Sequence, residues 1–231
     1  MTLRAFGSAL FALTLGACAT RSPLPAARQA DNQFESEIQA FEAADRAHAP
    51  PAGGVVFVGS SSIRLWQTLE ADFPDARVIN RGFGGSELAD AVRYAPRIVL
   101  PYSPALVVLY AGDNDLAAGQ SPELVLRDYQ AFVRLVRSKL PETRIAFISI
   151  KPSPSRWALA AKVRKANRLV KEYSSGDRRL HYVDVYTPML DAAGAPRREL
   201  YLADGLHLNA AGYAIWRDHI AAIIARFRRE P

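Results

Sequence analysis

Five short apolar runs, separated by longer stretches of helical character, are the feature that most constrains the fold. Runs of four to seven residues between helices are typical of βαβ units, whose parallel strands are buried on both faces. The expected strands cover residues 55–58, 77–80, 105–110, 144–150 and 180–185. We therefore predict an α/β fold built on one buried parallel sheet.

The stretches between these runs have the spacing of amphipathic helices. The expected helices lie around residues 63–69, 87–99, 122–140, 157–173 and 210–228. A further helix, at 31–48, precedes the first strand, because Phe34, Ile38 and Phe41 follow at spacings of four and three. The sequence Pro-Pro-Ala-Gly-Gly at 50–54 ends it. We expect residues 31–231 to form a single domain.

Composition excludes several classes of protein. Apolar residues make up 49% and charged residues 23%, which is ordinary for a globular domain and not for a disordered chain or a coiled coil. No run of 18 apolar residues exists, so no spanning helix is expected. The net charge of +6 raises the question of nucleic acid. However, the arginines form short dispersed clusters, so we expect a solvated or lipid-facing surface and no nucleic-acid partner.

The single cysteine follows a segment with the pattern of a secretory leader. Residues 1–17 carry Arg4 and then an apolar stretch too short to span a bilayer. Leu15-Gly16-Ala17-Cys18 resembles a bacterial lipobox; the alternative is an ordinary signal peptide with a cysteine there by chance. We therefore expect a lipidated Cys18, a tether over residues 18–30 and anchoring to a membrane. Ala19 in place of aspartate favours the outer membrane of the cell envelope, facing the periplasm.

Four clusters of polar residues and glycines follow the expected strands or precede the last helix. They are Gly59-Ser60-Ser61-Ser62, Asn80-Arg81-Gly82-Phe83-Gly84-Gly85, Gly112-Asp113-Asn114-Asp115 and Asp204-Gly205-Leu206-His207. Parallel sheets place their ligand sites at the carboxyl ends of the strands. A serine nucleophile needs a histidine base that a carboxylate orients, and acyl transfer also needs donors for the oxyanion. The clusters contain each of these groups.

A second Asp-x-x-His sequence, Asp45 and His48, falls at the end of the first expected helix. We interpret His48 there as a helix-terminal histidine that the helix dipole favours.

The four clusters resemble, in order and spacing, the conserved blocks of the SGNH (GDSL-type) hydrolase superfamily, over most of residues 55–215. The resemblance implies a three-layer α/β/α fold around a five-stranded parallel, flavodoxin-like sheet. It also implies a serine esterase with Ser61 as nucleophile, His207 as base and Asp204 as its partner. The oxyanion donors would be the N–H groups of Ser61 and Gly85 and the amide of Asn114. No cofactor and no metal are expected.

One departure from the family pattern affects the choice of serine. Ser60 stands where the family has aspartate, which leaves the register open among Ser60, Ser61 and Ser62. Ser61 is favoured because Gly59 lies two residues before it, as in the family. We expect Ser60 and Ser62 to cap the following helix through their hydroxyls.

Other enzyme classes lack their motifs. An α/β-hydrolase elbow requires Gly-x-Ser-x-Gly, but Ile63 occupies the last position. A dinucleotide site requires Gly-x-Gly-x-x-Gly after the first strand, and the glycines at 82–85 do not fit that motif or that place. The alternative from another class is a catalytically silent envelope lipoprotein of the same fold, acting in binding or scaffolding.

The substrate is left open among small-molecule, lipid and glycan esters, and the sequence predicts no oligomeric state. Arg64, Trp66, Trp157 and Tyr201 fall near the expected site loops. For Trp66 we favour packing into the core, whereas for Trp157 contact with a pocket and packing are equally weighted.

Overall fold

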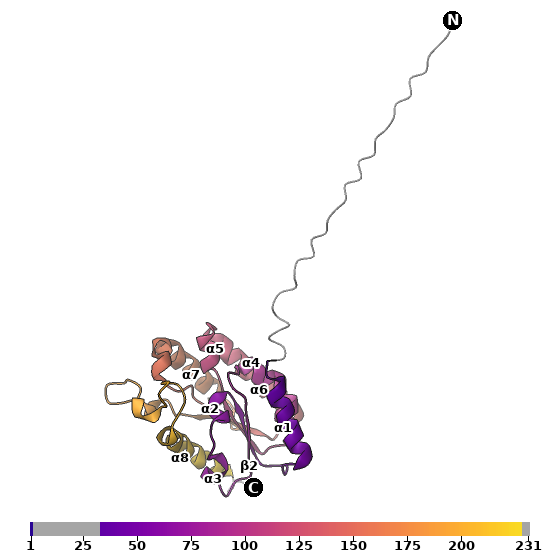
Figure 1. Cartoon of the computed structure of the whole chain (residues 1–231), viewed down its shortest axis with the longest axis horizontal. Helices are drawn as coiled ribbons and strands as arrows, with labels where there is room; N and C mark the ends of the chain where they lie inside the picture. Colours follow the sequence, from indigo (N-terminus) through magenta and orange to yellow (C-terminus); the bar gives the residue numbers. More distant parts are fainter. Residues whose placement is uncertain (2–32, 228–231) are drawn as a thin grey trace. The chain divides into compact units, whose positions relative to one another are not determined.

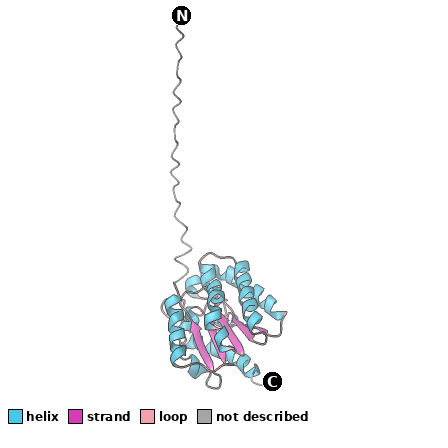
Figure 2. Ribbon diagram, turned by 90° about the vertical axis from the view of Figure 1, so that its right-hand side faces the viewer, coloured by secondary structure: helices cyan, strands magenta, loops and turns pink. Residues whose placement is uncertain are grey.

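The apolar runs form one parallel sheet in the computed structural model, which describes Met1 and residues 33–227 (Figure 2). Its strands are β1 (Val55–Gly59), β2 (Val78–Gly82), β3 (Leu106–Tyr110), β4 (Arg144–Ile148) and β5 (Leu180–Val183). They lie in the order β2-β1-β3-β4-β5, and every neighbouring pair is parallel. This is the flavodoxin-like order, so the predicted sheet is confirmed.

Eight α-helices and four short 3₁₀-helices are described around the sheet. The α-helices are α1 (Glu35–Ala47), α2 (Ser61–Arg64), α3 (Leu69–Asp72), α4 (Leu88–Ile98), α5 (Asp113–Ala117), α6 (Pro122–Lys139), α7 (Ala160–Ser175) and α8 (Ala210–Phe227). The 3₁₀-helices are Leu100–Tyr102, Pro154–Leu159, Thr187–Met189 and Arg198–Leu200.

The two faces of the sheet are covered by different sets of helices. Along β1, Val56 and Val58 join the apolar core beneath α1, α4, α6 and α7. Val55 and Phe57 join the second core, beneath α2, α3 and α8. In Figure 1, α8 and α3 accordingly lie across the strands from α1 and α6. This alternation confirms the three-layer α/β/α architecture, because successive strand residues point to opposite faces.

Helix α6 shows how local sequence sets an element. Ser121 precedes it, and its hydroxyl accepts a hydrogen bond from the Leu124 N–H at 3.1 Å. Pro122 occupies the first turn, where a missing N–H costs nothing. The helix turns one apolar stripe to the core, formed by Val125, Tyr129, Phe132, Val133 and Val136. The predicted helix over 122–140 is thus confirmed to within one residue.

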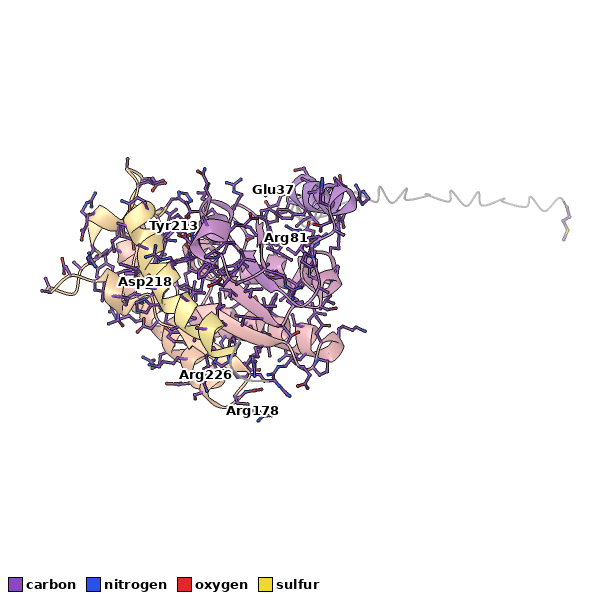
Figure 3. All side chains as sticks on the ribbon, turned by 90° about the horizontal axis from the view of Figure 1, so that it is seen from below. Glu37, Arg81, Arg178, Tyr213, Asp218 and Arg226 are labelled. Atoms are coloured by element: carbon purple, nitrogen blue, oxygen red, sulfur yellow. The ribbon has the colours of Figure 1, made fainter. Side chains whose placement is uncertain are left out.

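The segment after β1 differs from the prediction. One helix was expected around residues 63–69, but two four-residue helices, α2 and α3, flank Trp66. Trp66 is 1% exposed, its indole N–H donates to Asp72 Oδ2 at 2.6 Å, and its ring stacks on Tyr213 of α8. Figure 3 shows Tyr213 on α8. The buried ring lies between the two short helices, and its burial confirms Trp66 as a core residue.

Helix α1 begins at Glu35, four residues after the expected start. Residues 34–227 belong to one compact unit. The expected signal peptide, Cys18 and the tether lie outside the described residues. No helix among the described residues is long and apolar enough to cross a membrane.

Candidate active site

The turn after β1 places Ser61 at the edge of the sheet. Gly59, the last residue of β1, has φ +137°, and a Cβ there would lie 1.8 Å from the carbonyl oxygen of Tyr110 on β3. Only glycine therefore allows β1 and β3 to pair to their ends before the chain turns. Ser61 is the first residue of α2, so its N–H has no acceptor within the helix.

Ser61, His207 and Asp204 form one chain of hydrogen bonds. His207 Nε2 lies 3.0 Å from Ser61 Oγ, although the two residues are 146 positions apart. His207 Nδ1 lies 2.6 Å from Asp204 Oδ2. The structure therefore brings the three predicted triad residues together in the expected order of contacts.

The loop that carries His207 is fixed by its own backbone. Leu202 N–H donates to the His207 carbonyl at 2.8 Å, beside an antiparallel bridge between Tyr201 and Leu208. Asp204 Oδ1 accepts the N–H groups of Leu206 and His207, both at 2.9 Å. The hydrogen bond to the His207 ring and these two N–H groups lower the pKa of Asp204 to about 2.

The three neighbouring serines have different surroundings. Only Ser61, which is half-buried, contacts His207. The Ser60 hydroxyl is buried and has no hydrogen-bond partner among the described residues, and the Ser62 hydroxyl accepts from Lys151 Nζ at 3.1 Å. The expectation that Ser60 and Ser62 cap the helix through their hydroxyls is wrong: Ser60 holds the N-cap position without a side-chain bond, and Ser62 lies inside α2.

Gly85 and Asn114 flank the same edge of the sheet. Gly85 follows β2 in a left-handed conformation with φ +82°. Asn114 follows β3 on α5, and its Nδ2 donates to the carbonyl of Ser86 at 2.9 Å. Strand β2 is tied to α2 by Asn80, whose Nδ2 donates to the Ile63 carbonyl at 2.8 Å. The predicted oxyanion residues thus belong to adjoining loops, held together by hydrogen bonds.

Beneath these loops lies a buried ionic cluster that the sequence analysis did not identify. Lys151 lies in the segment that follows β4 and is 2% exposed. Its Nζ donates to Asp113 Oδ2 and to the Tyr110 hydroxyl, each at 2.9 Å, and to Ser62. Three acceptors match the three N–H donors of an ammonium group. Arg156 NH1 adds a second cation 3.2 Å from Asp113 Oδ2.

The charges in this cluster support one another. Burial alone would raise the pKa of Asp113, but Lys151 and Arg156 outweigh it and leave that pKa below its ordinary value. Burial lowers the pKa of Lys151, and the contact with Asp113 opposes this effect. A sequence signal for Lys151 exists: a lysine directly after an apolar strand needs a buried partner.

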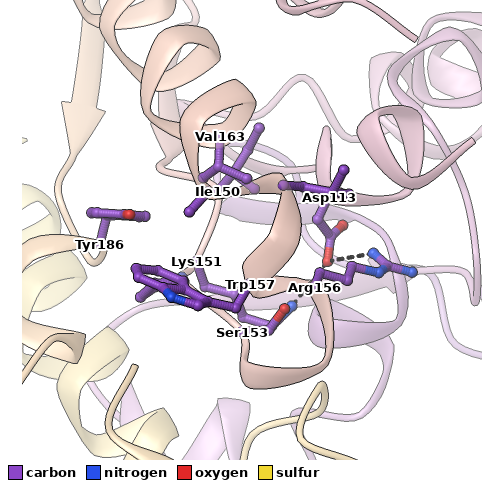
Figure 4. A pocket seen from close by; sticks show the side chains of 11 residues that line it. Asp113, Ile150, Lys151, Ser153, Arg156, Trp157, Val163 and Tyr186 are labelled. Carbon is purple, nitrogen blue, oxygen red and sulfur yellow. Dashed lines mark hydrogen bonds and ion pairs between the residues drawn. The ribbon is translucent and has the colours of Figure 1, made fainter. Parts of the chain in front are cut away.

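A small pocket lies beside this cluster (Figure 4). Trp157 and Tyr186 line it together with Lys151 and Arg156, so Trp157 does contact a pocket. Tyr201 is buried, and its hydroxyl donates to the Pro152 carbonyl at 3.2 Å.

Two other residues singled out from the sequence make structural contacts. Arg64 forms an ion pair with Glu37 of α1 at 3.2 Å. His48 is the C-cap residue of α1, and the neighbouring Asp45 accepts hydrogen bonds from Arg81 and Tyr102. The Asp45–His48 pair is therefore separate from the triad, and the helix-terminal interpretation of His48 is confirmed.

No group of three or more histidine, cysteine, aspartate or glutamate side chains arranged to hold a metal ion occurs within the part of the chain that the structure describes.

Fold and site together define an α/β protein whose serine, histidine and aspartate meet at the carboxyl edge of a parallel sheet. Comparison with known proteins narrows this class. The family model of the GDSL-like Lipase/Acylhydrolase family matches residues 51–215. Platelet-activating factor acetylhydrolase IB subunit alpha1 from Homo sapiens is 27% identical over 194 residues, covering 80% of this chain and 80% of that protein.

One further curated relative and two solved structures are similar to the chain. A GDSL esterase/lipase from Oryza sativa is 26% identical over 219 residues, covering 79% of this chain and 82% of that protein. The crystal structure of a GDSL-like lipase from Bacteroides thetaiotaomicron superposes with a TM-score of 0.71 at 23% identity, covering 83% of this chain and 98% of that one. A carbohydrate esterase of family 3 from Talaromyces cellulolyticus shares the fold, with a TM-score of 0.63 at 16% identity, covering 78% of this chain and all of that one.

The chain belongs to the GDSL-like lipase/acylhydrolase family, and it is an ester-hydrolysing enzyme.

Asp115, beside Asn114, makes the stability of the folded protein depend on pH. It is fully buried; its Oδ1 accepts the Leu88 N–H at 3.0 Å, whereas Oδ2 has no partner among the described residues. Burial raises its pKa from 3.8 to about 7. The folded protein therefore holds this proton more tightly than the unfolded chain, so this group's contribution to stability falls as pH rises from about 4 to about 7.

We predict that Asp115→Asn removes this loss, because the amide keeps an acceptor for Leu88 N–H and carries no charge. At pH 8 the free energy of unfolding should rise by on the order of 1–3 kcal/mol relative to wild type, with little gain at pH 4. Urea denaturation at both pH values measures this. The exposed Asp218→Asn (Asp218 is labelled in Figure 3) is the control. A variant less stable than wild type at pH 8 would contradict the prediction.

Proposed function

We propose that the protein is a serine esterase that hydrolyses carboxylic esters through Ser61, His207 and Asp204. The observation that carries the proposal is the continuous hydrogen-bond chain from Asp204 Oδ2 through the His207 ring to Ser61 Oγ. In this arrangement His207 can accept the proton of the Ser61 hydroxyl, and Asp204 fixes the tautomer of the His207 ring.

In the first half of the reaction, His207 Nε2 takes the proton of Ser61 Oγ as that oxygen attacks the ester carbonyl carbon. The carbonyl π bond opens and its oxygen becomes negative. Asp204 remains ionised above about pH 2 and stabilises the imidazolium through Nδ1–H. The imidazolium then gives its proton to the leaving alkoxide, which departs as the alcohol and leaves an acyl group on Ser61.

In the second half, water attacks the acyl carbon while His207 accepts one of its protons. The new tetrahedral intermediate collapses, Ser61 Oγ regains a proton from His207, and the carboxylic acid leaves. In both halves the oxyanion would be held by the N–H groups of Ser61 and Gly85 and by the Asn114 amide. Donors aimed at developing charge in a preorganised site are commonly the largest single contribution to such catalysis.

The nucleophile is tested by two adjacent substitutions. Ser61→Ala should lower kcat for p-nitrophenyl acetate by about 10³-fold or more, since the triad loses its attacking oxygen. Ser60→Ala should keep most of the activity, since the Ser60 hydroxyl makes no hydrogen bond to His207 or to any other described residue. Full activity in Ser61→Ala, or loss of activity only in Ser60→Ala, would move the nucleophile to another residue.

We further propose that the acyl group is short and that the ester is carried by a lipid or a glycan. The support is the relative named as an acetylhydrolase, which covers most of this chain. With p-nitrophenyl acetate, butyrate and octanoate, kcat/KM should be highest for acetate. A maximum at octanoate would contradict the proposal. Release of acetate from acetylated xylan or peptidoglycan fragments is then compared with release from an acetylated lipid. The comparison shows whether the alcohol part of the substrate is a glycan or a lipid.

We also propose that Cys18 is lipidated and anchors the enzyme to the envelope. The support is the leader pattern and the placement of the single cysteine. When the full chain is expressed in a bacterium with radiolabelled palmitate, wild type should incorporate label and sediment with outer-membrane vesicles. Cys18→Ser should do neither. A labelled Cys18→Ser protein, or an unlabelled wild type, would contradict lipid anchoring.

A further inference from the structure

Arg156 joins the buried ionic cluster to the oxyanion side of the active site. It lies in the 3₁₀-helix Pro154–Leu159, and its side chain is 22% exposed. One guanidinium nitrogen, NH2, donates to Asn114 Oδ1 at 3.0 Å. The other, NH1, lies 3.2 Å from Asp113 Oδ2, the pair that Figure 4 marks with a dashed line. Arg156 therefore touches the side chain of one proposed oxyanion donor while a buried carboxylate holds it in place.

These contacts leave the Asn114 amide only one orientation. A guanidinium offers donors and no acceptor, so it requires the amide oxygen on its side. The Ser86 carbonyl only accepts, so it requires the amide nitrogen on the other side, where Nδ2 lies at 2.9 Å. A flipped amide would set donor against donor and acceptor against acceptor. Of the two N–H groups on Nδ2, one donates to Ser86, and within the described part of the chain no acceptor is seen for the other.

The backbone of Asn114 is held by the same cluster. The Asn114 N–H donates to Asp113 Oδ1 at 3.0 Å, while Asp113 Oδ2 contacts both Lys151 and Arg156. Asp113 thus binds Asn114 with one oxygen and the two cations with the other. Lys151 is in turn fixed by Tyr110 and Ser62, on β3 and α2.

The sign of the cluster suits the proposed chemistry. Lys151 and Arg156 carry two positive charges against the one negative charge of Asp113, which leaves a single net positive charge. A charged donor on Oδ1 also polarises the amide and strengthens its N–H groups as donors. Both effects stabilise an oxyanion more than the neutral ester that precedes it.

We propose that Arg156 is a positioning residue of the oxyanion hole, which fixes and polarises the Asn114 amide so that its free N–H faces the reacting carbonyl oxygen. This inference rests on the proposed esterase function. Arg156 acts through Asn114 and is not assigned a contact with the substrate.

A double-mutant cycle with p-nitrophenyl acetate tests this role. Arg156→Met keeps the long apolar stem and removes the donors. We expect kcat to fall roughly 10–100-fold with KM changed less than about threefold. The Asn114 amide acts mainly in the transition state, so misplacing it lowers kcat and affects KM little. Arg156→Lys, which restores a charged donor, should recover part of that loss. Asn114→Ala alone should lower kcat by roughly 10²–10³-fold.

The double variant shows whether Arg156 acts through Asn114 or independently of it. In the Asn114→Ala background, Arg156→Met should lower kcat by less than about twofold, because no amide is left to position. Arg164→Met, on the exposed face of α7, is the matched control and should change kcat little in either background. Melting temperatures of all variants report whether they fold.

The outcomes separate the positioning role of Arg156 from the proposed esterase function. Equal losses from Arg156→Met in both backgrounds, or a loss that appears in KM alone, would overturn the positioning role while leaving the esterase intact. Full kcat in a folded Arg156→Met protein would do the same. Absence of Ser61-dependent turnover in wild type would instead overturn the proposed function.

Discussion

The pairing of β1 with both β2 and β3 is the constraint on which the site depends. In register, Gly59 lies opposite Gly82 on one side and Tyr110 on the other, so the three strands end at the same level. The loops that follow them therefore start side by side and carry Ser61, Gly85 and Asn114. In this strand order the chain reverses direction across the sheet between β1 and β3, the place where parallel sheets bind ligands.

The second constraint is electrostatic. A lysine with 2% exposure is costly to bury unless its charge is matched and its donors are used. Asp113, Tyr110 and Ser62 meet that requirement, and in doing so they connect α2, β3 and the loop after β4. The same carboxylate also orients Arg156 and the Asn114 backbone. The Lys151 ammonium, paired with this buried anion, thus links the serine-bearing helix α2 to the segment that carries Asn114.

The fold was predictable to a large extent because the apolar runs of a doubly covered sheet are continuous and easy to recognise. The helices with clear caps and stripes, such as α6, were placed within a residue or two. The break at Trp66 was not predictable, because the ring packs against Tyr213 of α8, which is far away in the sequence.

For the site, the four clusters and their resemblance to the blocks of the family predicted Ser61, Gly85, Asn114, Asp204 and His207, and the structure brings Ser61, Asp204 and His207 into one hydrogen-bond chain. The roles of Lys151 and Arg156 were missed. Both follow β4, and their partners Asp113 and Asn114 follow β3. Only the folded sheet shows that these four side chains meet.

The most direct test of the account is the site of covalent modification by a fluorophosphonate, read by mass spectrometry of peptides from the labelled protein. A fluorophosphonate reacts with a serine oxygen that a neighbouring base has activated, with loss of fluoride. The account predicts one adduct, on Ser61, which is absent from His207→Ala. An adduct on Ser60 or Ser62, or labelling of Ser61 that persists undiminished without His207, would contradict it.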